Sequence, residues 1–442
     1  MDQNITVVKF GGTSLADAGQ FSKVASIVRS DPKRRYVVVS APGKRFSSDI
    51  KITDLLIRCY NAKTPEDRAA AFDVISDRFF SIERELCLDT GILAEIEAIR
   101  EKVESPEGVT YSYLISRGEY LSARLMADYL GYDFVDAAGM IFFDDKGVLD
   151  EPKTYRTVRE ILEGHERAVI PGFYGSLADG SINTFPRGGS DITGSVIARG
   201  VEAHLYENWT DVSGVLMADP RIIPDAKCID VLTYRELREL SYMGTQVLQE
   251  EAVFPVKQLG IPINVRNTND VTAPGTMIVA EAPPSASGRT VTGLAGRRGF
   301  SVLLIEKTFM NNQVGFMRRV LSLFEKHDIS VEHVPTGIDT LSVVFESAKA
   351  TPEAIGDIIA SINRDLKVDY ISYSENVALV AVAGRNMVNR SGTAGTILTQ
   401  LGKAGINILL LAQSSNEINI IVGIEAMHFE KTLRILYDLF KD

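Results

Sequence analysis

Two glycines follow a lysine at the end of an apolar stretch near the start of the chain. Residues 5–10 (Ile-Thr-Val-Val-Lys-Phe) read as a buried strand, and Gly11 and Gly12 lead from it into a helical pattern. Glycines let backbone N–H groups approach a phosphate, a helix N-terminus adds partial positive charge, and the ammonium of Lys9 stands at the strand end. The pattern is neither G-x-x-x-x-G-K-[ST] nor G-x-G-x-x-G, so alone it is as typical of a structural turn as of a phosphate site.

A second glycine-rich turn combines an arginine with an aspartate. Arg187 precedes two glycines, and Ser190 and Asp191 follow at the start of a helical pattern over 191–199. A planar guanidinium on a loop suits a carboxylate. A carboxylate such as Asp191 is expected near an anion site only if it binds a cation or a polar hydrogen there. The alternative is an ordinary turn in which Ser190 or Asp191 caps the helix.

Three further positions gain meaning only beside these two turns. A strand over 204–209 ends at Thr210 and Asp211, the usual ligand edge of a parallel sheet. Arg221 follows a Pro-fixed turn, and Glu119 lies in an amphipathic helix expected over 112–130. An ordinary turn and a solvated surface charge are the alternative interpretations.

Strands alternate with helices through the first part of the chain, which favours a parallel α/β sheet covered on both faces. The expected strands are 5–10, 36–40, 168–173 and 204–209, and the expected helices lie mainly in 51–104, 112–130 and 191–199. Residues 281–288, Glu-Ala-Pro-Pro-Ser-Ala-Ser-Gly, have the composition of a linker and mark the end of the first domain.

The tail of the chain contains an internal repeat. Gly315 aligns with Gly392, 77 positions later, and apolar residues at 324, 329 and 331 then meet apolar residues at 401, 406 and 408. Each copy reads as strand, glycine-led loop, helix, strand, turn and strand, which is typical of a ferredoxin-like core. Chance alignment of two α/β stretches is the alternative, but the apolar period and the turn residues agree with each other.

Composition excludes several classes of protein. The formal net charge is −11 and no dense Lys/Arg run is present, which argues against nucleic-acid binding. The three cysteines form no C-x-x-C pair, so we expect reduced thiols rather than disulfides or a zinc site. No secretory pattern opens the chain, and no apolar run reaches membrane-spanning length. We therefore expect a cytoplasmic protein without nucleic-acid or membrane partners.

The order of the motifs resembles the aspartate kinases of the amino-acid-kinase superfamily. These motifs are Lys-Phe-Gly-Gly-Thr-Ser at 9–14, Gly-Glu at 118–119, Arg-Gly-Gly-Ser-Asp at 187–191 and Thr-Asp-Val at 210–212, and the tail repeat resembles tandem ACT domains. The resemblance covers essentially the whole chain. It implies an α/β fold, a three-layer αβα sandwich with a mainly parallel central sheet, plus two ferredoxin-like ACT domains.

The resemblance also implies domain boundaries. We expect the kinase domain over 1–282, a linker over 283–298, and ACT domains over 299–370 and 371–442. Because no G-x-G-x-x-G module follows the second repeat, we expect a monofunctional kinase of the lysine-sensitive type.

The same resemblance assigns roles to individual residues. Lys9, Gly11, Gly12 and Ser40 would surround the transferring phosphoryl group, and Asp191 would organise Lys9. The other expected contacts are Thr210, Asp211 and Arg221 with ATP, and Thr53, Glu119, Phe173, Arg187 and Ser190 with aspartate, where Arg187 grips the α-carboxylate and Glu119 the α-ammonium. The chain departs from the family pattern at Pro186, Leu216 and Gln246, where many members have Gly, some have a nucleotide-stacking Tyr and many have Lys. The outer contacts of the nucleotide therefore stay open.

The implied reaction converts ATP and L-aspartate into ADP and 4-phospho-L-aspartate, the first step of lysine, threonine and methionine biosynthesis. The attacking carboxylate is ionised near neutral pH, so catalysis needs positioning and charge neutralisation rather than a general base. The chain shows no ligand cage for a metal, so Mg²⁺ should arrive with ATP. The alternatives are a related kinase acting on glutamate, acetylglutamate, carbamate or UMP, and an inactive amino-acid sensor.

The tail should bind a free amino acid that inhibits the kinase, and we favour lysine over threonine. The expected contacts are Met310, Gln313, Val314, Gly315, Glu332 and Thr336. The glycine-led loop offers N–H groups for an α-carboxylate, and Glu332, which aligns with Leu409, offers a partner for a lysine ammonium. An exposed strand residue is the equally weighted alternative for Glu332. Sheet edges of the tail should pair between copies, which gives a homodimer or higher homo-oligomer.

Overall fold

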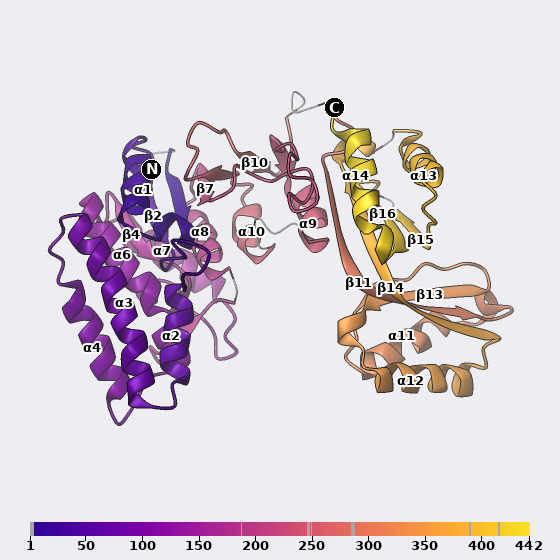
Figure 1. Cartoon of the computed structure of the whole chain (residues 1–442), viewed down its shortest axis with the longest axis horizontal. Coiled ribbons are helices and arrows are strands. Elements are labelled where there is room, and N and C mark those ends of the chain that lie inside the picture. Colours follow the sequence, from indigo (N-terminus) through magenta and orange to yellow (C-terminus); the bar gives the residue numbers. More distant parts are fainter. Residues whose placement is uncertain are drawn as a thin grey trace. The chain divides into compact units, whose positions relative to one another are not determined.

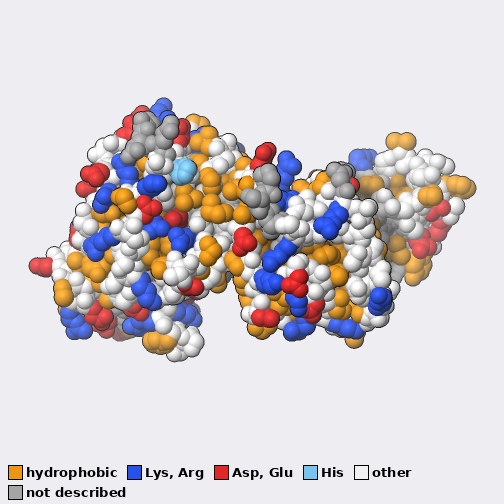
Figure 2. All heavy atoms as spheres, turned by 90° about the horizontal axis from the view of Figure 1, so that it is seen from above, with side chains coloured by type: hydrophobic (Ala, Val, Ile, Leu, Met, Phe, Trp, Pro, Cys, Tyr) orange, Lys and Arg blue, Asp and Glu red, His pale blue; other side chains and the backbone are white. Residues whose placement is uncertain are grey.

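The computed structural model describes residues 4–186, 188–244, 248, 250–283, 288–388, 390–413 and 416–442. The chain forms two compact units (Figure 1). The first comprises Met1–Val215, Cys228–Tyr234 and Val247–Ala286, and the second comprises Leu216–Lys227, Arg235–Gln246 and Ser287–Asp442. Figure 2 shows cationic and anionic side chains interspersed over the face that it draws. Within the described ranges, no helix has both the length and the apolar character needed to cross a membrane.

A mainly parallel sheet with strand order β3-β4-β2-β1-β7-β9-β10-β8 forms the centre of the first unit. Its strands are β1 (Thr6–Phe10), β2 (Arg34–Val39), β3 (Asp133–Phe134), β4 (Ala168–Pro171), β7 (Leu205–Thr210), β8 (Val231–Thr233), β9 (Ile263–Asn267) and β10 (Thr276–Val279). The β9–β10 pair is antiparallel and the other pairs are parallel. β1 and β4 are buried along their whole length, which explains why β4 is entirely apolar and why β1 is apolar except at Thr6 and Lys9.

Helices cover both faces of this sheet. One face carries α1 (Ala18–Arg29), α2 (Ile52–Asn61), α3 (Pro65–Glu85), α4 (Ile92–Glu104), α5 (Tyr111–Ile115) and α6 (Arg117–Leu130), and the other carries α7 (Glu151–Leu162), α8 (Gly189–Gly200) and α10 (Glu250–Lys257). A hairpin of β5 (Tyr174–Ser176) and β6 (Ile182–Thr184) and two short 3₁₀ helices, Gly12–Leu15 and Ala137–Gly139, complete the layers. Capping fixes the starts of helices: Thr64 accepts from the Asp67 N–H just before Pro65 opens α3.

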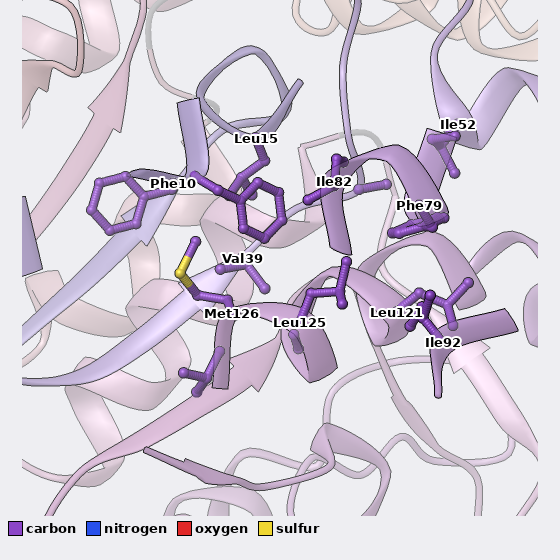
Figure 3. Close-up of a cluster of buried hydrophobic side chains, with 14 of the residues drawn as sticks. Phe10, Leu15, Val39, Ile52, Phe79, Ile82, Ile92, Leu121, Leu125 and Met126 are labelled. Carbon is purple, nitrogen blue, oxygen red and sulfur yellow. The ribbon is translucent and has the colours of Figure 1, made fainter. Parts of the chain in front are cut away.

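The main core lies between the sheet and helices α1 to α6. Figure 3 shows Phe10 and Val39 from the strands together with Phe79 of α3 and Leu125 and Met126 of α6. All five side chains are essentially inaccessible to solvent. Burying such a side chain contributes about 1.5–3 kcal/mol to stability, so this layer holds the strand ends of β1 and β2 in fixed positions.

The second unit is built around two long antiparallel strands, β11 (Gly293–Glu306) and β14 (Tyr370–Ala383). The other elements are α9 (Tyr234–Tyr242, of which Arg235–Tyr242 belong to this unit), α11 (Phe316–Lys326), β12 (Val331–His333), β13 (Thr340–Glu346), α12 (Pro352–Ser361), α13 (Thr393–Lys403), β15 (Leu410–Gln413), β16 (Asn419–Glu425) and α14 (Phe429–Phe440), together with short helical turns at Met310–Asn312, Ser347–Lys349, Ile362–Leu366, Arg385–Met387 and Ala426–His428. The strand order is β12-β13-β11-β14-β16-β15.

Each tail repeat uses one half of this long ribbon (Figure 1). β13 pairs with residues 300–306 of β11, and β16 pairs with residues 377–383 of β14. Residues 293–298 of β11 pair with 378–383 of β14, so the second repeat takes its fourth strand from residues that precede the first repeat. The predicted order of elements in each copy is confirmed. Gly315 and Gly392 each precede a helix, and each glycine has a positive φ.

Some predicted boundaries differ from the structure. Residues 293–298, expected in a linker, form the first half of β11. The segments 216–227 and 235–246, expected in the kinase domain, pack with the second unit. The helix expected over 112–130 is interrupted at Ser116, whose hydroxyl donates to the Tyr113 carbonyl at 2.7 Å. A side chain that competes for a backbone carbonyl in this way interrupts regular helical bonding.

Candidate active site

Lys9 and Asp191 form an ion pair beside the end of β1. Nζ of Lys9 lies 2.6 Å from Oδ1 of Asp191, and the two side chains are 8% and 17% exposed. Asp191 stands in the first turn of α8 and also accepts from Nδ2 of Asn208 at 2.8 Å. Lys9 and Asn208 are paired neighbours on β1 and β7, so the parallel register brings both to one carboxylate. The predicted proximity of Lys9 and Asp191 is confirmed.

The glycines after β1 meet a second loop at very short range. A Cβ added to Gly11 would lie 3.5 Å from Nζ of Lys9, so the ammonium stands next to this residue. The N–H of Gly43 donates to the Gly12 carbonyl at 2.7 Å, directly after the half-buried Ser40 and the Ala41-Pro42 step. A Cβ on Gly12 would lie 2.8 Å from the Ala41 carbonyl oxygen, and one on Gly43 would lie 2.7 Å from the Gly12 carbonyl carbon. Both positions therefore require glycine.

Glu119 is a buried carboxyl with an unsatisfied oxygen. The residue is 5% exposed on α6, and its Oε2 has no hydrogen-bond partner among the residues that the structure describes. Burial raises the pKa of Glu119 to about 8, and a hydrogen bond from the Ala41 backbone and the charges of Arg117 and Lys9 act in the opposite direction. A buried carboxyl with an unsatisfied oxygen can accept a cationic group. The alternative interpretation of Glu119 as a solvated surface charge is therefore wrong.

Phe173 adopts a strained backbone conformation after β4. Its φ is 80°, an unusual value for an aromatic residue, and its N–H donates to Oγ1 of Thr193 at 2.9 Å. A Cβ on Gly189 would lie 2.6 Å from the Phe173 ring. Ser190 packs equally tightly, because a Cβ on Gly172 would lie 2.8 Å from its Oγ. Phe173 and Ser190 are thus held together at the N-terminus of α8.

Thr210 ends β7 beside the Gly11 turn, and Asp211 follows it. The N–H of Gly11 donates to the Trp209 carbonyl at 3.0 Å, and Oγ1 of Thr210 donates to Oδ1 of the exposed Asp211 at 3.2 Å. Thr53 is half-buried in the first turn of α2. This helix is anchored by a hydrogen bond from the Ile52 N–H to the Pro42 carbonyl at 3.1 Å, next to the Gly12–Gly43 contact.

Two of the predicted site residues are arginines for which the structure gives no contact with these residues. Arg187 lies outside the described residues. Arg221 belongs to the second unit, where its guanidinium lies 2.6 Å from Asp219, and its side chain is 77% exposed. Gln246 also lies outside the described residues. Among the residues described, no three His, Cys, Asp or Glu side chains are grouped closely enough to hold a metal ion.

Sequence reasoning missed Asn208 and the pair Arg78–Asp49. Arg78 on α3 is 3% exposed, and its NH2 lies 2.8 and 2.7 Å from the two oxygens of Asp49. Arg45 contacts the same carboxylate, and hydrogen bonds from Arg45 hold the pKa of Asp49 well below its usual range. The sequence could have indicated Asn208, because it is a polar residue within an otherwise buried strand. Arg78, in contrast, has the pattern of a surface charge on an amphipathic helix.

The predicted effector residues lie in the second unit. Met310 is buried, Gln313 is partly buried, and Val314 is almost fully exposed beside Gly315. Glu332 on β12 accepts a hydrogen bond from the hydroxyl of Tyr242, the last residue of α9. A cavity of about 430 Å³ is lined by Thr336 and, from the second repeat, by Gln413, which occupies the equivalent position. A further cavity of about 370 Å³ lies at the Gly392 loop.

Comparisons with known proteins agree with this arrangement. The amino acid kinase family model matches residues 4–267, and an ACT domain model matches residues 380–440. Aspartokinase 3 of Bacillus subtilis (strain 168) is 36% identical over 447 residues, which cover 98% of each chain.

Solved structures give the same result. The crystal structure of Clostridium acetobutylicum aspartate kinase is 46% identical with a TM-score of 0.87, covering 99% of this chain and 100% of its own. Aspartokinase III of E. coli, with the same coverage, is 25% identical with a TM-score of 0.78 in complex with aspartate and ADP, and 0.75 in complex with lysine and aspartate. The chain therefore belongs to the amino acid kinase family and, within it, to the aspartokinases.

Proposed function

We propose that this chain transfers the γ-phosphoryl group of ATP to the side-chain carboxylate of L-aspartate. The carrying observation is the Lys9–Asp191 pair beside the interlocked Gly12 and Gly43, with the unsatisfied carboxyl of Glu119 close enough for its charge to interact with Lys9. A cation beside a tight glycine turn suits a phosphate, and a neighbouring buried acid suits an ammonium, so this combination supports the proposal. The E. coli complex with aspartate and ADP supports the same pair of ligands here.

The chemistry needs two anions held together. Lys9 neutralises charge on the transferring phosphoryl group, and Asp191 and Asn208 keep its ammonium oriented. Glu119 takes the α-ammonium and Arg187 the α-carboxylate of aspartate, while Phe173 and Ser190 shape the wall of the substrate site. Mg²⁺ enters with ATP and supplies further charge neutralisation on its phosphates. The attacking carboxylate is already ionised, so no side chain has to remove a proton.

The test is an acceptor panel. ADP release and hydroxamate trapping of the acyl phosphate are measured with aspartate, glutamate, acetylglutamate and carbamate, and a separate ADP-release assay uses UMP. We expect turnover with aspartate and little with the others. If another acceptor is turned over faster, that acceptor rather than aspartate is the substrate. Binding of amino acids without any ADP release would indicate an inactive sensor.

We also propose that free lysine inhibits this kinase through the tail repeats. Thr336 and Gln413, equivalent by the repeat, line one cavity, which is suited to a small polar ligand. Glu332 is an acid at the edge strand β12 whose present partner is the neutral hydroxyl of Tyr242. A lysine ammonium is a stronger partner for a carboxylate than a phenol. The E. coli complex with lysine and aspartate supports the choice of lysine.

Helix α9 offers a route for this signal. Glu236 of α9 is fully buried and accepts from Thr292 at 2.6 Å and from Arg385 at 3.0 Å, while Tyr242 at the other end of the helix meets Glu332. A lysine ammonium that binds Glu332 would break the hydrogen bond between Tyr242 and Glu332. One end of α9 would then be released, while Glu236 keeps the other end anchored. The effector must bind the less active state more tightly for this exchange to inhibit.

Activity titrated separately with lysine, threonine and methionine tests the regulatory proposal. Inhibition by threonine alone would be consistent with a regulatory tail but would contradict the role given to Glu332.

β12 and β15 are the edge strands of the sheet of the second unit. We also propose that copies of the chain pair through these edges as a homodimer, to be measured by light scattering with and without lysine. We further propose a cytoplasmic location.

A further inference from the structure

The buried guanidinium of Arg78 touches both loops that meet at the Gly12–Gly43 contact. Its NH1 donates to the Gly43 carbonyl at 3.1 Å and to the Ala16 carbonyl at 3.4 Å. Ala16 ends the short helix that starts at Gly12, so one nitrogen holds both sides of the interlocked backbone. Neither loop is held at this point by strand pairing, because β1 ends at Phe10 and β2 ends at Val39.

The second nitrogen of the same guanidinium reaches the loop that leads to Thr53. NH2 of Arg78 binds both oxygens of Asp49, whose side chain is 8% exposed. Asp49 in turn accepts from the backbone and side chain of Arg45, so residues 43–49 close on themselves around this carboxylate. Arg78 thus joins the Gly12 turn, the Gly43 turn and the 45–49 loop.

The burial of this pair argues against a role in stability alone. An ion pair removed from water pays a desolvation cost that its attraction often fails to recover, so apolar residues stabilise such a position at least as well. Arg78 also keeps its Nε without a hydrogen-bond partner among the described residues. Unlike an apolar side chain, the guanidinium is a rigid planar fork, and its two terminal nitrogens bind two carbonyls and a carboxylate at the same time.

We propose that Arg78 is a positioning residue that sets the spacing of the Gly12 and Gly43 backbones for phosphoryl transfer. The proposal rests on the proposed kinase function, since it assumes that these backbones surround the transferring group. A preorganised backbone around the transferring group acts mainly on the transition state, and a displacement of the order of 1 Å costs about 10²-fold in rate. Loss of Arg78 should therefore lower kcat and leave the KM values for ATP and aspartate nearly unchanged.

The experiment compares Arg78→Lys, Asp49→Asn and Arg45→Ala in the full chain. A lysine ammonium cannot span the two carbonyls and both oxygens of Asp49, so we expect kcat to fall about 10- to 100-fold with KM values within about 3-fold. Asp49→Asn keeps the carbonyl contacts and should give a smaller fall in kcat. Arg45 binds the same carboxylate with a side chain that is 39% exposed, and such an exposed ion pair contributes little, so Arg45→Ala should stay within about 3-fold of wild type.

Thermal melting and chemical rescue separate positioning from folding. Each variant is assayed below its Tm, and Arg78→Ala is assayed with millimolar guanidinium, which should restore part of kcat. The inference is overturned if folded Arg78→Lys keeps kcat within 3-fold, or if kcat falls only in proportion to the folded fraction. If Arg78→Lys does not fold, an unchanged kcat in Asp49→Asn also overturns it. Wild-type protein without aspartate kinase activity would instead refute the proposed function.

Discussion

The buried carboxyl of Glu119 predicts an unusual pH dependence of aspartate binding. Its pKa in the free enzyme is raised to about 8 by burial, so the carboxyl is mostly neutral at pH 7. In the proposed function, the ionised form of Glu119 pairs with the α-ammonium of aspartate. Substrate binding must therefore remove a proton from Glu119, and this removal costs more as the pH falls below the pKa.

The size of the effect follows from the pKa. The apparent KM for aspartate is multiplied by one plus the ratio of neutral to ionised Glu119. With a pKa of about 8, that factor is about 100 at pH 6 and about 2 at pH 8, so the KM should fall about 50-fold over this range. At saturating aspartate the carboxyl is already ionised, so kcat should change much less.

Steady-state kinetics of the wild type and Glu119→Gln at pH 6, 7 and 8 provide the assay. Glutamine is close in size to the neutral acid, so the variant should show a high KM with little dependence on pH. A wild-type KM that stays constant over this range would refute the reasoning, and so would a Glu119→Gln variant that keeps the steep dependence.

Stability gives an independent check on the same group. The pKa of Glu119 is raised on folding, so its contribution to stability is full below the pKa of the unfolded chain and is lost as pH rises through about 8. The Tm of the unliganded wild type should therefore fall from pH 7 to pH 9 more than the Tm of Glu119→Gln.

Other substitutions test the remaining roles. Lys9→Ala should lose about 10²–10⁴ in kcat with little change in ATP affinity, because its charge acts on the transferring phosphoryl group; near-normal turnover would remove it from catalysis. Arg187→Ala should raise the KM for aspartate about 10-fold or more and leave the KM for ATP little changed, because a bidentate carboxylate contact exists before the transition state; an unchanged aspartate KM would place Arg187 elsewhere. Glu332→Gln should weaken lysine inhibition about 10-fold or more without changing uninhibited activity, while Tyr242→Phe should strengthen it by removing the competing hydroxyl; inhibition curves that do not move would separate Glu332 from the effector.

Local pattern was enough to predict that Lys9 and Asp191 lie close together beside a glycine turn. Lys9, Gly11 and Gly12 follow one another in a strand–turn–helix pattern, and Asp191 opens the next helix after a glycine turn. The physical requirement at these positions is backbone geometry, which glycine spacing reveals directly. The repeat in the tail was visible for the same reason, since Gly315 and Gly392 both need a positive φ.

Contacts between segments that are distant along the chain could not be predicted from local sequence patterns. Arg78 lies 35 positions from Gly43 along the chain, and nothing in an amphipathic helix distinguishes it from a solvated arginine. Asn208 reads only as an interruption of an apolar strand. The sequence predicts a linker for the first half of β11, because these residues follow a Pro/Ser/Gly run and their pairing partner lies about 85 residues downstream in β14.

The long ribbon of β11 and β14 makes the two tail repeats one inseparable block. A fragment cut out at residue 371 would lose residues 293–298 and leave the apolar strand from Val377 to Ala383 with a bare edge, a template for aggregation. Exchanging regulation between relatives therefore requires moving the whole region from 288 onwards, together with the residues around Glu236 that are buried against it. Because one copy cannot be exchanged without the other, differences between the two copies, such as Glu332 against Leu409, have to be introduced by substitution in place.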